Sequence, residues 1–209
     1  MFPEILSKKQ LELLKEISKV KSINESFYLA GGTALALQIG HRRSYDFDFF
    51  SYSKFDSLKF QSIILKDFSG KIFSKSDDTI NGMIGKIRIS FFIYPYKLIR
   101  NSKQFSSIEL ASLEDLVCMK CSAISDRAEK RDYFDIYELF KIFQPMEVRN
   151  LLLEKYRVNG NNLYHLMKCL FNFDFVENTP EPESLNGTTW KIVKNYLIKN
   201  QQKILKAFI

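Results

Sequence analysis

Hydrophobic and polar positions follow two different patterns along this chain, and the pattern changes near residue 105. Before that point, short apolar runs of strand length alternate with helix-like stretches. After Ser107, apolar residues recur at every third or fourth position, which is the period of an amphipathic helix. We therefore predict an α/β (α+β) protein in two parts. Residues 1–107 should form a domain with a mixed, partly antiparallel sheet, and residues 108–209 should form a helical bundle.

The first part combines helices with short strands. Helices are expected at about residues 5–20, after Thr33 and at about 55–67. Strands are expected at 27–30, at 45–50 and in the runs "GKIFSKS", "DTINGMIG" and "KIRISFFIY". The turns between these three runs are expected at Asp-Asp and at Asn-Gly, which are turn-forming pairs.

The second part is a series of helical segments. They are "LEDLVCMKCSAI", "YFDIYELFKIF", "MEVRNLLLEKY", "NLYHLMKCLFNF" and "WKIVKNYLIKNQQKILKAFI", with the loop "FVENTPEPESLNGTT" before the last one. In the last segment Trp190, Val193, Leu197, Leu205 and Phe208 lie at helical spacing. This stripe is expected to pack on the bundle and to leave the lysines outside.

The composition favours a cytoplasmic globular protein with an anionic partner. The chain has 209 residues, 45% of them hydrophobic, and a formal net charge of +7. Such a charge is typical of proteins that bind nucleic acid or nucleotide phosphates, or it serves solubility. No run approaches the roughly 18 apolar residues of a membrane span, and the N-terminus lacks the core of a signal peptide, so no membrane partner is expected. Cys118 and Cys121 are expected to be buried thiols, since a zinc site would need two further ligands.

The stretch "YLAGGTALALQIGHRRSYDFDFF" carries the most specific chemistry. Gly31 and Gly32 follow an apolar run and precede a helix, so backbone N–H groups and the positive end of a helix dipole are presented to an anion. The absence of Cβ atoms lets a phosphate approach the backbone. The spacing is neither that of a P-loop nor that of a dinucleotide-binding fold, so the glycine pair alone is a weak signal.

Two aspartates add specificity to this stretch. On a strand, residues i and i+2 point to the same face about 7 Å apart, so Asp46 and Asp48 should project together. Tyr45, Phe47 and Phe49 should then fill the opposite, buried face. Adjacent carboxylates repel each other unless a cation lies between them, and Mg²⁺ or Mn²⁺ commonly combines such carboxylates with substrate phosphates. The alternative is an edge strand whose two aspartates face solvent.

These residues resemble a known family. "GGTALALQIGHRRSYDFDFF" resembles the signature of the nucleotidyltransferase superfamily, in which a glycine pair is followed by D-x-[DE], and it is similar to the AbiEii/AbiGii toxin branch in particular. A second block, "SLEDLVCMKCSAISDRAEKRDYFDIYEL", resembles a later motif of that branch. The resemblance implies a nucleotidyltransferase fold in the first part and a helical domain that completes the nucleotide cleft in the second.

The resemblance also implies roles for single residues in the first block. Gly31, Gly32 and Thr33 match the turn that surrounds the triphosphate. Asp46 and Asp48 match the carboxylates that bind the metal and serve catalysis.

Other matches flank and follow that block. Arg42 and Ser44 match the lead-in to the aspartates and are candidate nucleotide contacts. Lys120 matches a lysine that reaches the nucleotide phosphates, and Asp132 matches an essential acid of the second block. Because twelve residues along one straight helix would separate these two by roughly 18 Å, we expect a helix break near residues 125–126.

One departure from the superfamily pattern concerns the base that deprotonates the attacking hydroxyl. Many members carry a third carboxylate on a later strand, and this chain has Ser90 in the corresponding run "GKIRISFFIYPY". A serine cannot act as that base at neutral pH. Asp132 is the first alternative, and Asp77 or Asp78 is the second.

The resemblance implies a toxin of a toxin–antitoxin system that transfers a nucleoside monophosphate from an NTP (GTP, CTP or another) to an RNA hydroxyl, with a tRNA as the expected acceptor. Mg²⁺ or Mn²⁺ would be the cofactor, and an antitoxin protein would be a further partner. Two other hypotheses remain open. The protein could be a catalytically silent module that binds nucleotide or RNA, or a purely structural member of a toxin–antitoxin pair.

Overall fold

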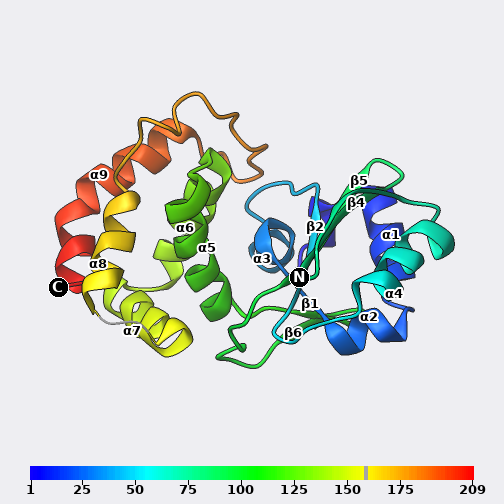
Figure 1. Cartoon of the computed structure of the whole chain (residues 1–209). Coiled ribbons are helices and arrows are strands. Elements are labelled where there is room, and N and C mark those ends of the chain that lie inside the picture. The colour runs from blue at the N-terminus through cyan, green and yellow to red at the C-terminus, as the bar shows by residue number, and fades with distance from the viewer. Residues whose placement is uncertain (158–159) are drawn as a thin grey trace. The chain divides into compact units, whose positions relative to one another are not determined.

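The computed structural model describes residues 1–157 and 160–209, which form two compact units of a mixed α/β protein (Figure 1). Unit 1 comprises Met1–Ile39, Ser44–Lys97 and Asn101–Ala111. Unit 2 comprises Gly40–Arg43, Leu98–Arg100 and Ser112–Ile209. The predicted α/β class is confirmed.

Unit 1 contains a seven-stranded sheet in the order β3-β4-β5-β2-β1-β7-β6. The strands are β1 Tyr28–Ala30, β2 Phe47–Ser51, β3 Lys71–Lys75, β4 Thr79–Ile84, β5 Ile87–Ile93, β6 Lys103–Phe105 and β7 Ile108–Leu110. β2 pairs with β5, and β1 with β7, in parallel, whereas the other neighbours are antiparallel. The sheet is therefore mixed, as predicted.

Helices cover both faces of this sheet. They are α1 Lys8–Ile17, α2 Lys21–Ser26, α3 Gly31–Ile39 and α4 Ser57–Ser62, with a short 3₁₀-helix η1 at Pro3–Ile5 and a short π-helix η2 at Ile63–Asp67. In Figure 1, α1 and α4 lie on one side of the sheet and α3 lies on the other. Phe47 and Phe49 are fully buried, and the ring of Phe49 stacks on Phe91 of β5. This aromatic face is the core that fixes the register of β2.

Three details of unit 1 differ from the sequence prediction. Tyr45 is 57% exposed, not buried, because β2 begins only at Phe47. The Asn81-Gly82 pair lies inside β4, and the turn to β5 falls at Gly85, whose φ is +60°. β6 and β7 were not predicted, since three-residue strands are too short to show an alternating pattern.

Unit 2 is helical, as predicted. Its helices are α5 Leu113–Arg127, α6 Lys130–Ile142, α7 Pro145–Tyr156, α8 Gly160–Cys169 and α9 Trp190–Ala207. The expected helix break is present, but it lies at Ala128, which has a φ of +41°, a few residues after the predicted position. Lys120 and Asp132 therefore belong to separate helices that meet at this break.

The packing of α9 follows its apolar stripe. Trp190, Val193 and Leu197 are buried, and Ile204 takes the place that the sequence suggested for Leu205. Cys118 and Cys121 of α5 are free buried thiols, and burial raises the pKa of Cys121 to about 12. These thiols contribute to the core of the bundle.

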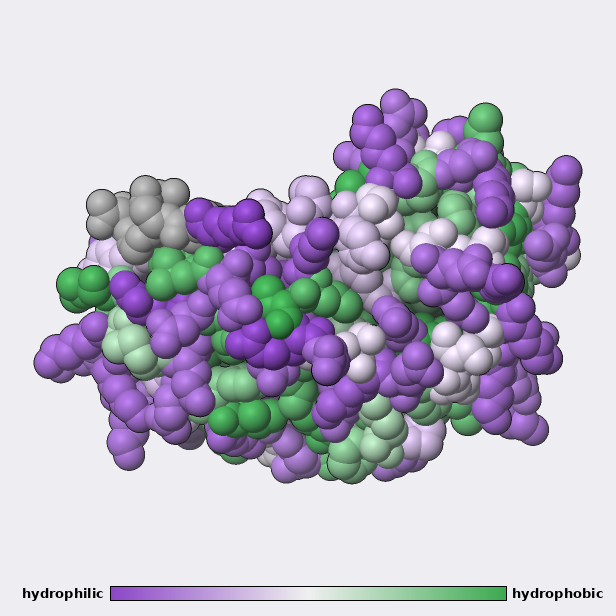
Figure 2. Space-filling view, turned by 90° about the horizontal axis from the view of Figure 1, so that it is seen from below, coloured by the Kyte–Doolittle hydropathy of each residue, from purple (hydrophilic) through white to green (hydrophobic). Residues whose placement is uncertain are grey.

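One face of the molecule is mainly polar. Hydrophilic side chains cover most of the face shown in Figure 2, and apolar groups form small separate areas on it. Among the described residues, no helix has an apolar run long enough to cross a bilayer.

Candidate active site

The carboxylate of Asp48 lies against the backbone at the start of α3. Gly31 is the first residue of α3 and has a φ of +68°, a conformation that favours glycine. A Cβ atom at this position would lie 2.8 Å from Asp48 Oδ2. Any other residue at Gly31 would therefore press on the carboxylate, so the glycine and the aspartate form one structural unit.

Buried hydrogen bonds hold the segment that leads to the two aspartates. Thr33 Oγ1 donates to the carbonyl oxygen of Asp46 at 2.5 Å and lies 2.8 Å from Ser44 Oγ. Gln10 of α1 donates to the carbonyl oxygen of Ser44 at 2.8 Å. Since Thr33 is 1% exposed and Ser44 is 7% exposed, their side chains position the Asp46 backbone. Their predicted contact with a nucleotide stays a prediction.

Register places Ser90 directly beside Asp48. Asp48 of β2 lies between Ala30 of β1 and Ser90 of β5, and Asn81 of β4 is the next residue in the same row. Neighbours in register project from the same face of a sheet. The row that carries Asp48 thus has a hydroxyl and an amide where a third carboxylate could stand.

The donor set fits a magnesium ion that draws its remaining ligands from a substrate. No group of three or more His, Cys, Asp or Glu side chains that could hold a metal occurs in the described residues. Mg²⁺ needs only one or two carboxylates when phosphate oxygens and water complete its octahedron. Asp48 lies on β2 and Asp46 in the segment just before it, so the predicted same-face spacing of two strand residues does not apply to Asp46. Their predicted joint binding of a metal stays a prediction.

Unit 2 contains a buried ion cluster around Lys120. Lys120 Nζ lies 2.8 Å from Asp132 Oδ1 and 2.6 Å from Asp135 Oδ2. The lysine side chain is 4% exposed and both carboxylates are fully buried. Half-exposed Arg127 adds a contact of 3.2 Å to the second oxygen of Asp132. The helix break after α5 makes these contacts possible, because it folds α6 back toward Lys120.

Asp135 is the centre of this cluster. Arg42 binds it with two parallel bonds, Nε to Oδ1 at 2.7 Å and Nη2 to Oδ2 at 2.9 Å. His41 Nε2 donates to Oδ1 at 2.7 Å. Arg42 is 3% exposed, so its guanidinium serves as an internal partner of the carboxylate. The sequence suggested a phosphate contact for Arg42, and that contact stays a prediction.

The cluster keeps both carboxyl groups ionised. Burial raises the pKa of Asp132, but the charges of Lys120 and Arg127 outweigh burial and leave that pKa below its ordinary value. Burial also raises the pKa of Asp135, but the charges of Arg42 and Lys120 outweigh it and hold that pKa well below its usual range. A carboxylate with a lowered pKa accepts a proton poorly. Asp132 is therefore a weak candidate for the base that the sequence suggested.

The structure divides the predicted site residues between the units. Unit 1 holds the glycine turn and its aspartates, namely Gly31, Gly32, Thr33, Ser44, Asp46 and Asp48. Unit 2 holds Arg42, Lys120 and Asp132. Asp135 was missed, although the motif "RDYFDIY" places it three residues after Asp132, on the same face of a helix.

Comparison with known proteins identifies the class. A solved H. pylori protein assigned to the nucleotidyltransferases superposes with a TM-score of 0.55 at 20% identity, over 97% of each chain. The antibiotic-resistance factor ANT(2'')-Ia superposes with a TM-score of 0.55 at 14% identity, over 77% of this chain and 97% of that one. Together with the glycine turn and the aspartate pair, these likenesses define a nucleotidyltransferase fold.

The family follows from the sequence of the second half. Residues 87–203 match the profile of the nucleotidyl transferase AbiEii toxin of type IV toxin–antitoxin systems. The chain belongs to this AbiEii family of nucleotidyltransferases. It is also 37% identical over 158 residues to the uncharacterized protein aq_aa25 of Aquifex aeolicus (strain VF5). The matched region covers 73% of this chain and 76% of that protein.

Proposed function

We propose that this protein transfers a nucleoside monophosphate from an NTP to a hydroxyl group of RNA, with a tRNA 3′ end as the acceptor. The observation that carries the proposal is the contact between Asp48 and the N-terminal turn of α3 at Gly31. It sets a carboxylate next to backbone N–H groups that suit phosphates. A metal–triphosphate complex needs both partners side by side.

Asp46 and Asp48 would hold Mg²⁺ or Mn²⁺. A metal bound there would neutralise charge on the α-phosphate and assist departure of pyrophosphate. Gly31 leaves room for the Asp48 carboxylate, and the turn of Gly31 and Gly32 would present its backbone N–H groups to the triphosphate. Thr33 and Ser44 keep the backbone of Asp46 in place for this task.

Lys120 is the proposed phosphate-binding residue of unit 2. Three cations, Arg42, Lys120 and Arg127, share two carboxylates, Asp132 and Asp135, so the cluster retains positive charge. A compact ammonium group with several donors can bind a phosphate while it keeps a carboxylate contact. Arg42 is proposed as a positioning residue that fixes Asp135 and, through it, Lys120.

The reaction balances without a covalent enzyme intermediate. The acceptor oxygen forms a bond to the α-phosphorus, and the bond from that phosphorus to the β-phosphate oxygen breaks. Pyrophosphate leaves, and the proton of the acceptor hydroxyl passes to water or to a carboxylate at the site. Ser90 cannot take that proton at neutral pH.

The net charge of +7 supports RNA as the acceptor, since a polyanion is attracted to such a surface. On α9 the exposed lysines are Lys191, Lys199, Lys203 and Lys206. A tRNA with a blocked 3′ end cannot be aminoacylated, so the proposed activity would stop growth. Membership of a type IV family supports an antitoxin as a further partner.

A labelling experiment tests the proposal. Purified protein is incubated with each of the four α-labelled NTPs, Mg²⁺ and total tRNA. The expected result is covalent label in RNA with one or two NTPs for the wild type, and at least 100-fold less for Asp48→Asn. Asp67→Asn is the matched control, because Asp67 is an exposed aspartate of the same unit that lies outside the site. RNA retained on filters without covalent label would favour the silent binding module.

A further inference from the structure

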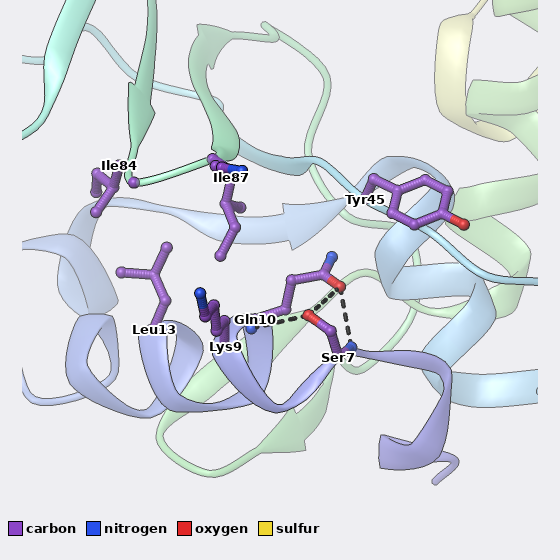
Figure 3. A pocket seen from close by; sticks show the side chains of 9 residues that line it. Ser7, Lys9, Gln10, Leu13, Tyr45, Ile84 and Ile87 are labelled. Atoms are coloured by element: carbon purple, nitrogen blue, oxygen red, sulfur yellow. Dashed lines mark hydrogen bonds between the residues drawn. The ribbon is translucent and has the colours of Figure 1, made fainter.

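A pocket beside α1 lies outside the site described above. Its volume is about 390 Å³. Its lining includes Lys9, Gln10, Leu13, Tyr45, Lys86 and Ile87, all in unit 1. In Figure 3 the side chains of α1 rise toward the strand ends that carry Ile84 and Ile87, and Tyr45 stands at the other end of the row. We call this hollow the α1 pocket.

The α1 pocket combines an apolar wall with two cations. Leu13 and Ile87 are half-buried and form the wall, whereas Lys9 and Lys86 are exposed at the rim. Within the described part of the chain, neither lysine forms an ion pair. A volume of this size suits a small organic group. The lining therefore suits a ring that carries an anionic group, as a nucleotide does.

Tyr45 supplies an exposed aromatic ring at this pocket. Its side chain is 57% exposed, although the next aromatic residue of the motif, Phe47, is fully buried. Proteins that bind single strands commonly combine a basic groove with an exposed aromatic ring on which an unpaired base stacks. Asp46 follows Tyr45 in the chain, so their Cα atoms are about 3.8 Å apart.

Gln10 connects the pocket to the aspartate segment. Its carboxamide oxygen accepts from the N–H of Ser7, and its nitrogen donates to the carbonyl oxygen of Ser44. Thr33 in turn bonds to the carbonyl oxygen of Asp46. The pocket wall and the metal-binding segment are thus parts of one hydrogen-bonded structure.

We propose that the α1 pocket holds a nucleotide of the single-stranded acceptor RNA. The base lies against the ring of Tyr45, and the phosphate lies between Lys9 and Lys86. An RNA strand fits this pocket better than a free nucleotide does. Two flexible surface amines hold one phosphate weakly, and an RNA strand adds contacts from its neighbouring nucleotides. This inference rests on the proposed function, since it takes RNA as the acceptor.

Fluorescence anisotropy tests the inference. The probe is a fluorescein-labelled RNA hairpin with a four-nucleotide single-stranded 3′ overhang, and no NTP is added. Lys9→Ala/Lys86→Ala and Tyr45→Ala should each raise Kd about tenfold. Lys8→Ala/Lys15→Ala is the matched control, because it removes the same charge from α1 at exposed positions outside the pocket, and it should raise Kd less than threefold. Tyr45→Phe keeps the ring and should bind as the wild type does.

Two results overturn the pocket assignment. One is an equal loss of affinity in both lysine pairs, which indicates general charge attraction. The other is an unchanged Kd in Tyr45→Ala. A wild type that binds the overhang through the pocket but labels no RNA contradicts only the proposed transfer. Normal transfer by Lys9→Ala/Lys86→Ala with unchanged KM for RNA contradicts only the pocket.

Discussion

Asp48 Oδ2 occupies the space next to Gly31 that a side chain would need, since a Cβ on Gly31 would lie 2.8 Å from it. This contact explains why a glycine must stand at the beginning of α3, and it links the two halves of the sequence motif physically. The glycine does not only permit a turn. It leaves room for the carboxylate.

Gly31→Ala should separate activity from stability. The positive φ of Gly31 and the displaced carboxylate should lower the free energy of unfolding by about 1–2 kcal/mol, while nucleotidyl transfer should fall at least 100-fold. Gly187→Ala is the control, because Gly187 has a φ of +76° with open space around it and should lose similar stability but keep activity. Chemical denaturation and the labelling assay measure both quantities. Equal activity in the two variants would contradict the assigned contact.

Asp135→Asn should destabilise the protein in a pH-dependent way. At pH 7 the loss should be about 3–5 kcal/mol, because Arg42 and Lys120 keep buried charges without a full partner. The folded-state pKa of Asp135 lies well below the ordinary 3.8, so the wild-type contribution is complete above about pH 5 and is lost as pH falls through the folded value. Urea unfolding between pH 3 and 7 should therefore show a constant difference between wild type and Asp135→Asn above about pH 5 and a difference that begins to narrow below it. If the free energies of unfolding of the two proteins stay parallel down to pH 3, the ionised Asp135 carboxylate does not have this stabilising role.

Lys120→Met should weaken nucleotide binding beyond its effect on stability. Lys155→Met is a close control, since Lys155 is also a fully buried lysine of unit 2 and pairs with Asp115 at 2.7 Å. Both variants should lower the free energy of unfolding by about 3–5 kcal/mol, because each removes a buried cation that contacts buried carboxylates. Only Lys120→Met should raise the Kd for the NTP–Mg²⁺ complex, by about tenfold or more. Calorimetric titration at a temperature where both are folded compares them, and equal Kd values would remove Lys120 from the phosphate site.

The sequence predicted the buried face of β2, because Phe47 and Phe49 alternate with Asp48 in a strand pattern. It also predicted separate helices for Lys120 and Asp132. It could not predict β6 and β7, whose short runs have no clear period. The pairing of Arg42 with Asp135 joins positions 93 residues apart, and no local pattern shows such a contact.

The sequence predicted the identity of the residue at position 90 in the motif but not its place beside Asp48. The alignment of motifs suggested a serine in place of an acid, but the register that sets it beside Asp48 depends on a parallel pairing between distant strands. Such long-range pairing follows from the whole core and not from either strand alone.

Ser90→Asp should create the missing carboxylate. Without metal, like charges in register should lower the free energy of unfolding by about 0.2–1 kcal/mol. With Mn²⁺ the variant should gain more thermal stability than the wild type, because three carboxylates bind the ion more tightly. Asn81→Asp lies one strand further along the same row and should gain less thermal stability from Mn²⁺ than Ser90→Asp does. Melting curves with and without Mn²⁺ decide this, and identical shifts in the three proteins would contradict a metal beside Asp48.

The most direct test of nucleotidyl transfer follows the fate of two phosphates in parallel reactions. Purified wild type and Asp48→Asn are incubated with tRNA, Mg²⁺ and the preferred NTP, labelled on the α-phosphate in one tube and on the γ-phosphate in the other. The account predicts that wild type places α-label in tRNA and releases γ-label as pyrophosphate, and that Asp48→Asn does neither. Label from the γ-phosphate in tRNA, or equal α-labelling by both proteins, would contradict it.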